Sequence, residues 1–117
     1  MNVVILRGRL SSAPGCRELP SGDSLVTFEV TTRPPGGPAE TVPVAWPNAP
    51  LRIATLPSGA EVVVAGRVRR RFFKAGGVTA SRTEVLAVAV LPATHQKRID
   101  RVVREAVAQV EPLLVAR

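Results

Sequence analysis

One stretch of the sequence is rich in basic residues and contains no acidic residue. Between residues 66 and 83 the basic side chains are Arg67, Arg69, Arg70, Arg71, Lys74 and Arg82. In a β-strand alternate side chains share a face, which predicts one face carrying Arg67, Arg69, Arg71 and Phe73. Guanidinium groups bind phosphates, and an aromatic ring offers a surface on which an unpaired base stacks. The stretch therefore favours binding of a single-stranded nucleic acid, since duplex recognition more often uses a helix in a groove.

The charge of the whole chain agrees with a polyanionic partner. Its 117 residues carry 16 basic and 9 acidic side chains, a net charge of +7, with a pI near 11.4. A positive surplus of this size is typical of proteins that bind nucleic acid. The alternative is that the arginines only keep an exposed hairpin soluble.

The chain has four aromatic residues, each with a different expected place. Phe28 alternates with polar neighbours between Val26 and Val30, which predicts a core position. Phe73 is the best candidate for base stacking. Trp46 has two interpretations: its parity with Val42 and Val44 would bury it, but the other face of its strand, with Thr41, Pro43 and Ala45, is poorly apolar too. We expect Trp46 to be exposed as a further platform. Phe72, on the opposite face from Phe73, is expected in the core or at its rim.

Several other classes of protein are disfavoured. The single cysteine, Cys16, and the single histidine, His95, cannot build a closed zinc site, and we expect no metal or cofactor. Neither residue has a partner in sequence that would make a nucleophile and base pair, and no glycine-rich phosphate loop occurs, so we expect no enzyme. No apolar run approaches the roughly 18–20 residues of a membrane helix. The N-terminal charges follow the apolar run, unlike in a signal peptide. We therefore expect a cytoplasmic, nucleoid-associated protein without membrane contact.

Apolar alternation and turn residues predict five β-strands, which suggests a small all-β barrel. The expected strands are 2–10, 24–33, 40–46, 61–74 and 78–91. A turn at 19–23 and a loop at 33–38 separate the first three strands, Cys16 lies in a loop, and 51–56 can form a short helical turn. Pro43 marks the third strand as an edge or a bulge.

A helix is expected after the last strand, over residues 94–111. Thr94 can cap its start and Pro112 can end it. Its apolar residues recur at helical spacing, namely Ile99, Val102, Val103, Ala106, Val107 and Val110. Two expected strands are apolar on both faces, at 62–65 and 85–91, so something must cover them. The helix could pack on its own barrel, against a second subunit or on a protein partner.

Residues 1–91 resemble the bacterial single-stranded DNA-binding protein family. The resemblance rests on the opening Met1 to Leu10, the turn Leu19-Pro20-Ser21-Gly22, the phrase from Leu56 to Arg69, and the strand around Ser81 to Val85. It implies a five-stranded OB-fold barrel over 1–91. The amphipathic α-helix expected from the apolar spacing then forms a separate segment, 92–117. Phe73 matches a stacking tryptophan of the family, and Trp46 matches a phenylalanine at the end of the third strand.

The resemblance also implies a function and partners. The family binds single-stranded DNA without sequence preference in replication, recombination or repair, and it assembles as homo-oligomers. A tetramer is favoured here, with a dimer as the alternative. The expected contacts are Arg67, Arg69, Arg71, Phe73, Trp46, Arg7, Arg9, Arg33, Lys74 and Arg82.

The chain departs from the family at three points. Two further stacking tryptophans are matched by Glu40 and by the loop near Gly36, and the 94–111 helix replaces the family's acidic tail. A second hypothesis is therefore an OB-fold interaction module with a weakened nucleic-acid site, which binds a partner protein through residues 94–111.

Overall fold

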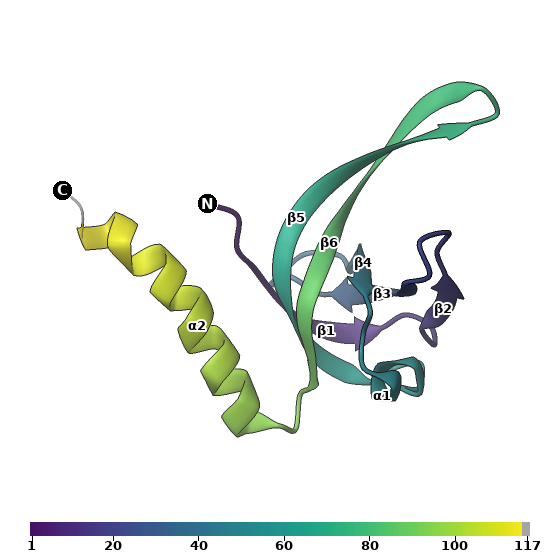
Figure 1. Cartoon of the computed structure of the whole chain (residues 1–117). Helices are drawn as coiled ribbons and strands as arrows, with labels where there is room; N and C mark the ends of the chain where they lie inside the picture. The colour runs from purple at the N-terminus through teal and green to yellow at the C-terminus, as the bar shows by residue number, and fades with distance from the viewer. Residues whose placement is uncertain (116–117) are drawn as a thin grey trace.

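Strands make up about half of the chain, and a long helix follows them (Figure 1). The computed structural model describes residues 1–115, and side chains through residue 113. The strands are β1 (Val4–Leu10), β2 (Gly15–Glu18), β3 (Ser24–Thr32), β4 (Glu40–Pro47), β5 (Glu61–Ala75) and β6 (Val78–Pro92). The helices are α1 (Leu51–Ala54) and α2 (Gln96–Val115). The five expected strands and the helical turn are confirmed to within two residues at each end.

The strands form one six-stranded sheet in the order β1-β5-β6-β4-β3-β2. An additional pairing joins β1 to β3, through Arg9 with Thr31 and Leu10 with Val30. Strands β1, β5, β6, β4 and β3 consequently form a closed ring of pairings. All are antiparallel except β4 with β6, where Val44 lies opposite Val85.

The core lies inside this ring and follows from the alternation along the strands. On β3, Val26, Phe28 and Val30 are buried, while Thr27 and Glu29 between them are exposed. The prediction for Phe28 is confirmed. Side chains from all five ring strands and from α1 meet in one apolar cluster, which includes Leu10, Val44, Ile53, Val62, Val64, Val85 and Val90.

Strand β2 is not among the expected strands, and the expectation that Cys16 lies in a loop is wrong. All four residues of β2 are exposed, so no alternation of apolar side chains marks it in the sequence. Its backbone pairs with β3, with Cys16 opposite Val26. The turn at 19–23 is confirmed, since the Leu19 N–H donates to the Asp23 carbonyl at 2.8 Å. That turn, rather than burial, brings β2 to the edge of the sheet.

Helix α2 begins later and ends later than expected. The carbonyl of His95 accepts the N–H of Ile99 at 3.0 Å, so His95 and not Thr94 is the residue that precedes the helix. Pro112 lies inside the helix and does not end it. A proline removes the backbone hydrogen bond to the residue four positions earlier. Near the end of a helix this costs one bond, and the chain can continue helically for a few residues.

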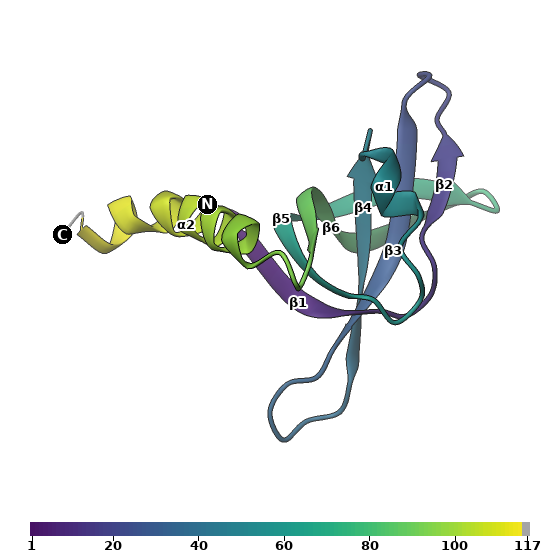
Figure 2. The ribbon, with the colours of Figure 1, turned by 90° about the horizontal axis from the view of Figure 1, so that it is seen from below.

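The first half of α2 packs on its own sheet. Ile99 and Val102 meet Val63 and Leu91 on the outer face of β5 and β6. The helix thus covers part of the outer face of β5 and β6, where the apolar residues on both faces of these strands led us to expect a cover. The helix then extends away from the sheet (Figure 2), and Val103, Val107 and Leu113 are exposed.

The hairpin of β5 and β6 is long because both strands continue well past the ring. A register shift at Ala65 and Gly66 bends it. A Cβ at Gly66 would collide with the backbone carbonyl of Leu86, so only glycine fits at this bend. Beyond the bend the hairpin arches over β2, β3 and β4 (Figure 1).

The side chain of Asn2 joins the start of the chain to this hairpin. Its amide donates to the carbonyl of Val68 and accepts the Val68 N–H, the latter at 2.8 Å. We expect Asn2→Ala to lower the free energy of unfolding by about 1 kcal/mol, because two exposed hydrogen bonds are lost. Urea unfolding measures the change, and Gln109→Ala, which truncates an exposed amide side chain on α2, provides the control. A stability equal to that of the wild type would show that the bonds to Val68 contribute nothing.

Candidate nucleic-acid interface

A groove of about 620 Å³ opens between the β5–β6 hairpin, β4 and the β2–β3 hairpin. We call it the arginine groove. Its charged and aromatic lining residues are Arg17, Arg69, Arg71, Arg82, Glu84 and Phe73. Its remaining lining residues are Leu19, Leu25, Thr27, Pro43, Val44, Ala45 and Pro47. Residues far apart in the sequence thus meet here, with the basic ones concentrated on the hairpin.

The register of the hairpin decides which side chains share the groove. Arg69 lies opposite Glu84, Arg71 opposite Arg82, and Phe73 opposite Ala80. Directly opposed residues point to the same face of the sheet. The predicted common face of Arg69, Arg71 and Phe73 is therefore confirmed, and β6 adds Arg82 and Glu84 to it.

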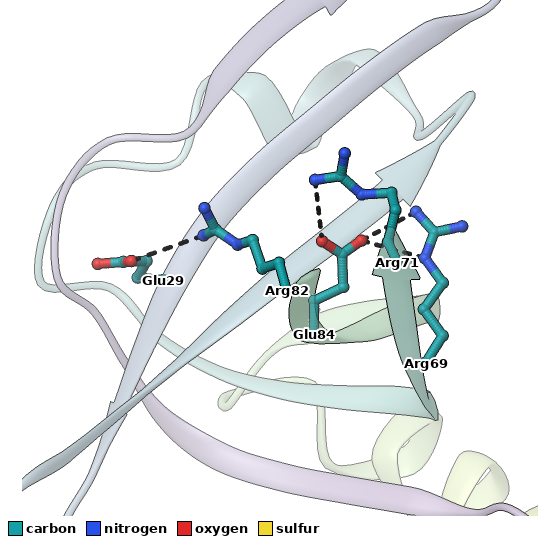
Figure 3. A network of polar contacts seen from close by, with 5 residues as sticks. All are labelled: Glu29, Arg69, Arg71, Arg82 and Glu84. Atoms are coloured by element: carbon teal, nitrogen blue, oxygen red, sulfur yellow. Dashed lines mark hydrogen bonds and ion pairs between the residues drawn. The ribbon is translucent and has the colours of Figure 1, made fainter. Parts of the chain in front are cut away.

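Glu84 is the one charged side chain found buried among the described residues, with 5% of it exposed. Arg69 donates to its Oε2 through Nε at 3.1 Å and Nη2 at 2.9 Å. Arg71 lies 3.5 Å from Oε1 (Figure 3). A single carboxylate therefore holds both guanidinium groups at the groove wall, while their outer N–H groups remain available to a ligand.

The basic stretch contains no acidic residue in sequence, but two glutamates outside it provide counter-charges in space. Glu84 pairs with two arginines from the neighbouring strand, and Glu29 of β3 lies 3.9 Å from Arg82 (Figure 3). The groove nevertheless keeps a positive surplus. Four lining arginines against one glutamate give +3.

Phe73 lies at the hairpin end of the groove with 38% of its surface exposed. The guanidinium carbon of Arg71 lies 5.3 Å from the centre of its ring. The guanidinium lies over one face of the ring, so a base would stack on the opposite face of the ring or on the guanidinium itself.

Phe72 contradicts its prediction. It is 65% exposed, on the opposite face of the hairpin, with Arg70 over its ring at 5.3 Å. The hairpin extends beyond the core at this point, so neither face can be buried against it.

Several predicted contact residues do not line the arginine groove. Arg7 and Arg9 of β1 pair with Glu61, at 2.9 Å and 3.6 Å. Arg33 lies after β3, in the loop to β4, and Lys74 is exposed near the hairpin tip. Arg67 is exposed on β5 but is not part of the lining.

Trp46 also lies elsewhere, and its expected exposure is wrong. It is half-buried and packs against the core, as its shared parity with Val42 and Val44 would require. It borders a different, smaller groove between β6, α1 and α2.

The main residue that sequence reasoning missed is Arg17. It lies on β2 opposite Leu25 and lines the arginine groove with Thr27 of β3. Its only signal in the sequence is its position just before the 19–23 turn. A hairpin at that turn places the residues before it alongside β3.

Within the described residues, no group of three or more His, Cys, Asp or Glu side chains is placed to hold a metal ion. No helix in that part of the chain is long and apolar enough to cross a membrane. Comparison with protein-family models gives no match for this chain. Comparison with curated proteins gives none either.

Proposed function

We propose that the chain binds single-stranded DNA, without sequence preference and without catalysis, in the arginine groove. The observation that carries the proposal is the joint lining of one groove by Arg17, Arg69, Arg71, Arg82 and Phe73. The guanidinium groups would bind backbone phosphates while Phe73 stacks on a base. Both kinds of contact are independent of base identity.

A single strand suits this groove better than a duplex. Its walls are strands and a turn, and among the described residues none of those that line it belongs to a helix that could enter a major groove. The aromatic ring is useful only to a base whose face is free, because in a duplex the neighbouring base pairs cover that face. Phe73 is therefore the residue by which the groove would distinguish a single strand from a duplex.

The ring of five strand pairings supports the finer proposal of an OB-fold barrel over residues 1–91. The resemblance to bacterial single-stranded DNA-binding proteins covers the same residues, and α2 begins just after them. A role in replication, recombination or repair, and a place with the nucleoid in the cytoplasm, follow from that resemblance.

A homo-oligomer, with a tetramer favoured, is part of the proposal. Val103 and Val107 on α2 are exposed apolar residues that a second subunit could cover. Sedimentation of the full chain would give the number of subunits directly.

The decisive test is a titration of fluorescent oligo-thymidine of about 35 nucleotides. This length can occupy the binding sites of one subunit or of several. We expect anisotropy to report tight binding of the single strand, weakened steeply by salt because phosphate contacts release counterions. A matched duplex should bind at least about five-fold more weakly, since its bases cannot stack on Phe73. Equal affinity for both ligands would reduce the groove to a non-specific electrostatic surface.

A further inference from the structure

A second groove, separate from the arginine groove, lies between β6, α1 and α2. We call it the outer groove. Its volume is about 190 Å³, against about 620 Å³ for the arginine groove. It is lined by Trp46, Pro50, Arg52, Val88, Ala89, Val90, Leu91, Arg98, Arg101 and Val102.

The outer groove has an apolar floor and a basic rim. Val88, on β6, is 68% exposed although it is aliphatic. Three arginines from two different helices also line the groove, namely Arg52 of α1 and Arg98 and Arg101 of α2. All three are exposed.

The arginines of the two grooves differ in their pairing. In the arginine groove Arg69, Arg71 and Arg82 each have a carboxylate within 4 Å. Within the part of the chain that the structure describes, no ion pair is found for Arg52, Arg98 or Arg101. Their charges are thus available to a ligand without first breaking an internal pair.

We propose that the outer groove binds a short acidic peptide segment of a partner protein, in which carboxylates flank an aliphatic or aromatic side chain. Charge complementarity argues for carboxylates, because guanidinium groups bind them with two parallel hydrogen bonds. The apolar floor argues for a hydrophobic side chain between them.

A nucleic-acid strand fits the outer groove less well. The groove is compact and its three arginines come from two separate helices, whereas phosphates along a strand need a row of basic groups. Trp46 is the one aromatic residue among the described residues that line the groove. It packs against the core, and the rest of the floor is aliphatic. An aliphatic floor receives a hydrophobic side chain but gives a base little to stack on.

The probe is a fluorescein-labelled peptide, Gly-Asp-Glu-Leu-Phe-Glu-Asp-Gly, titrated with the full chain at low salt. Arg98→Gln/Arg101→Gln should weaken its binding by about ten-fold or more, because two charge-assisted pairs are lost. The matched control is Lys97→Gln/Arg104→Gln, which removes the same charge from the same helix outside the groove and should change affinity less than about two-fold. All four side chains are exposed, so neither variant removes a core contact.

Two altered peptides test the chemistry of the ligand. Replacing the carboxylates by amides should abolish binding, and replacing Leu-Phe by Ser-Ser should weaken it by about ten-fold. The proposal is overturned if the acidic peptide does not bind at about 1 mM, if both double variants bind it equally, or if the Ser-Ser peptide binds as well as the original.

A nucleic-acid competitor distinguishes this proposal from the function proposed above. Oligo-thymidine should not displace the peptide, and Phe73→Ala should leave peptide binding unchanged. If oligo-thymidine displaces the peptide and Arg98→Gln/Arg101→Gln weakens both ligands alike, the outer groove is part of a nucleic-acid path instead. Failure of DNA binding alone would leave the peptide result intact.

Discussion

Simultaneous replacement of Arg69, Arg71 and Glu84 by glutamine should weaken single-stranded DNA binding by about 100-fold. Hydrogen bonds to charged groups contribute roughly 1.5–3 kcal/mol each, and two of them at the lower end correspond to about two orders of magnitude. The lower end applies because the two side chains are 34% and 40% exposed and are partly screened by solvent.

Glu84 must be changed together with the arginines. Replacing Arg69 and Arg71 alone would leave a carboxylate that is 5% exposed without its donors. An orphaned buried polar group costs roughly 1–3 kcal/mol, more when it is charged. The two-residue variant should therefore unfold at lower urea concentration than the wild type, and the third substitution should recover most of that loss.

Anisotropy at several salt concentrations separates this effect from a general loss of charge. The slope of the logarithm of the binding constant against the logarithm of the salt concentration should become shallower by about 1.4. Each lost phosphate contact on a single strand accounts for about 0.7 of that slope. The three substitutions change the net charge by −1, as Lys97→Gln on α2 does alone. That control should retain its affinity. A triple variant with wild-type affinity and salt dependence would exclude the arginine groove as the DNA site.

The ring of strands is predictable from the sequence because burial leaves a period of two. Val26, Phe28 and Val30 alternate with exposed neighbours, and the same parity rule correctly predicts that Arg69, Arg71 and Phe73 share one face. Where burial is absent the signal is absent too. Strand β2 is exposed and is held by backbone pairing with β3, so no pattern of side chains predicts it. The place of Arg17 on this strand could not be predicted for the same reason.

The electrostatic partners could not be predicted for a different reason. Glu84 lies just outside the stretch of basic residues, and its pairing with Arg69 depends on the register of β6 against β5. The tight turn at Gly76 and Gly77 sets the register of the outer part of the hairpin, where Arg69 lies opposite Glu84. The register shifts by one residue only nearer the core, between Ala65 and Gly66. Glu29 reaches Arg82 only through the tertiary fold.

The burial of single aromatic residues is hardest to predict at the limits of the core. Phe72 has the parity of a core residue, but its segment of the hairpin extends past the core and leaves it exposed. The expectation of an exposed Trp46 rests on the weakly apolar character of the other face of its strand. Trp46 packs inward because that face, which carries Pro43, Ala45 and Pro47, forms a wall of the arginine groove.

Phe73→Ala should weaken oligo-thymidine binding by about 5- to 150-fold, since stacking contributes roughly 1–3 kcal/mol per base. The loss should not depend on salt, because stacking releases no counterions. The affinity for a matched duplex should stay the same, and the preference for the single strand should therefore shrink by the same factor.

Phe72→Ala is the matched control, and the structure makes the comparison sharp. The two rings are neighbours on one strand, each has an arginine at 5.3 Å, and Phe72 is the more exposed, at 65% against 38%. If exposure alone made a stacking platform, Phe72→Ala would be the more damaging change. If the arginine groove is the site, only Phe73→Ala should weaken binding, because Phe72 lies on the opposite face. Equal losses in both variants would mean that DNA binds the hairpin from either side and that the groove gives it no path.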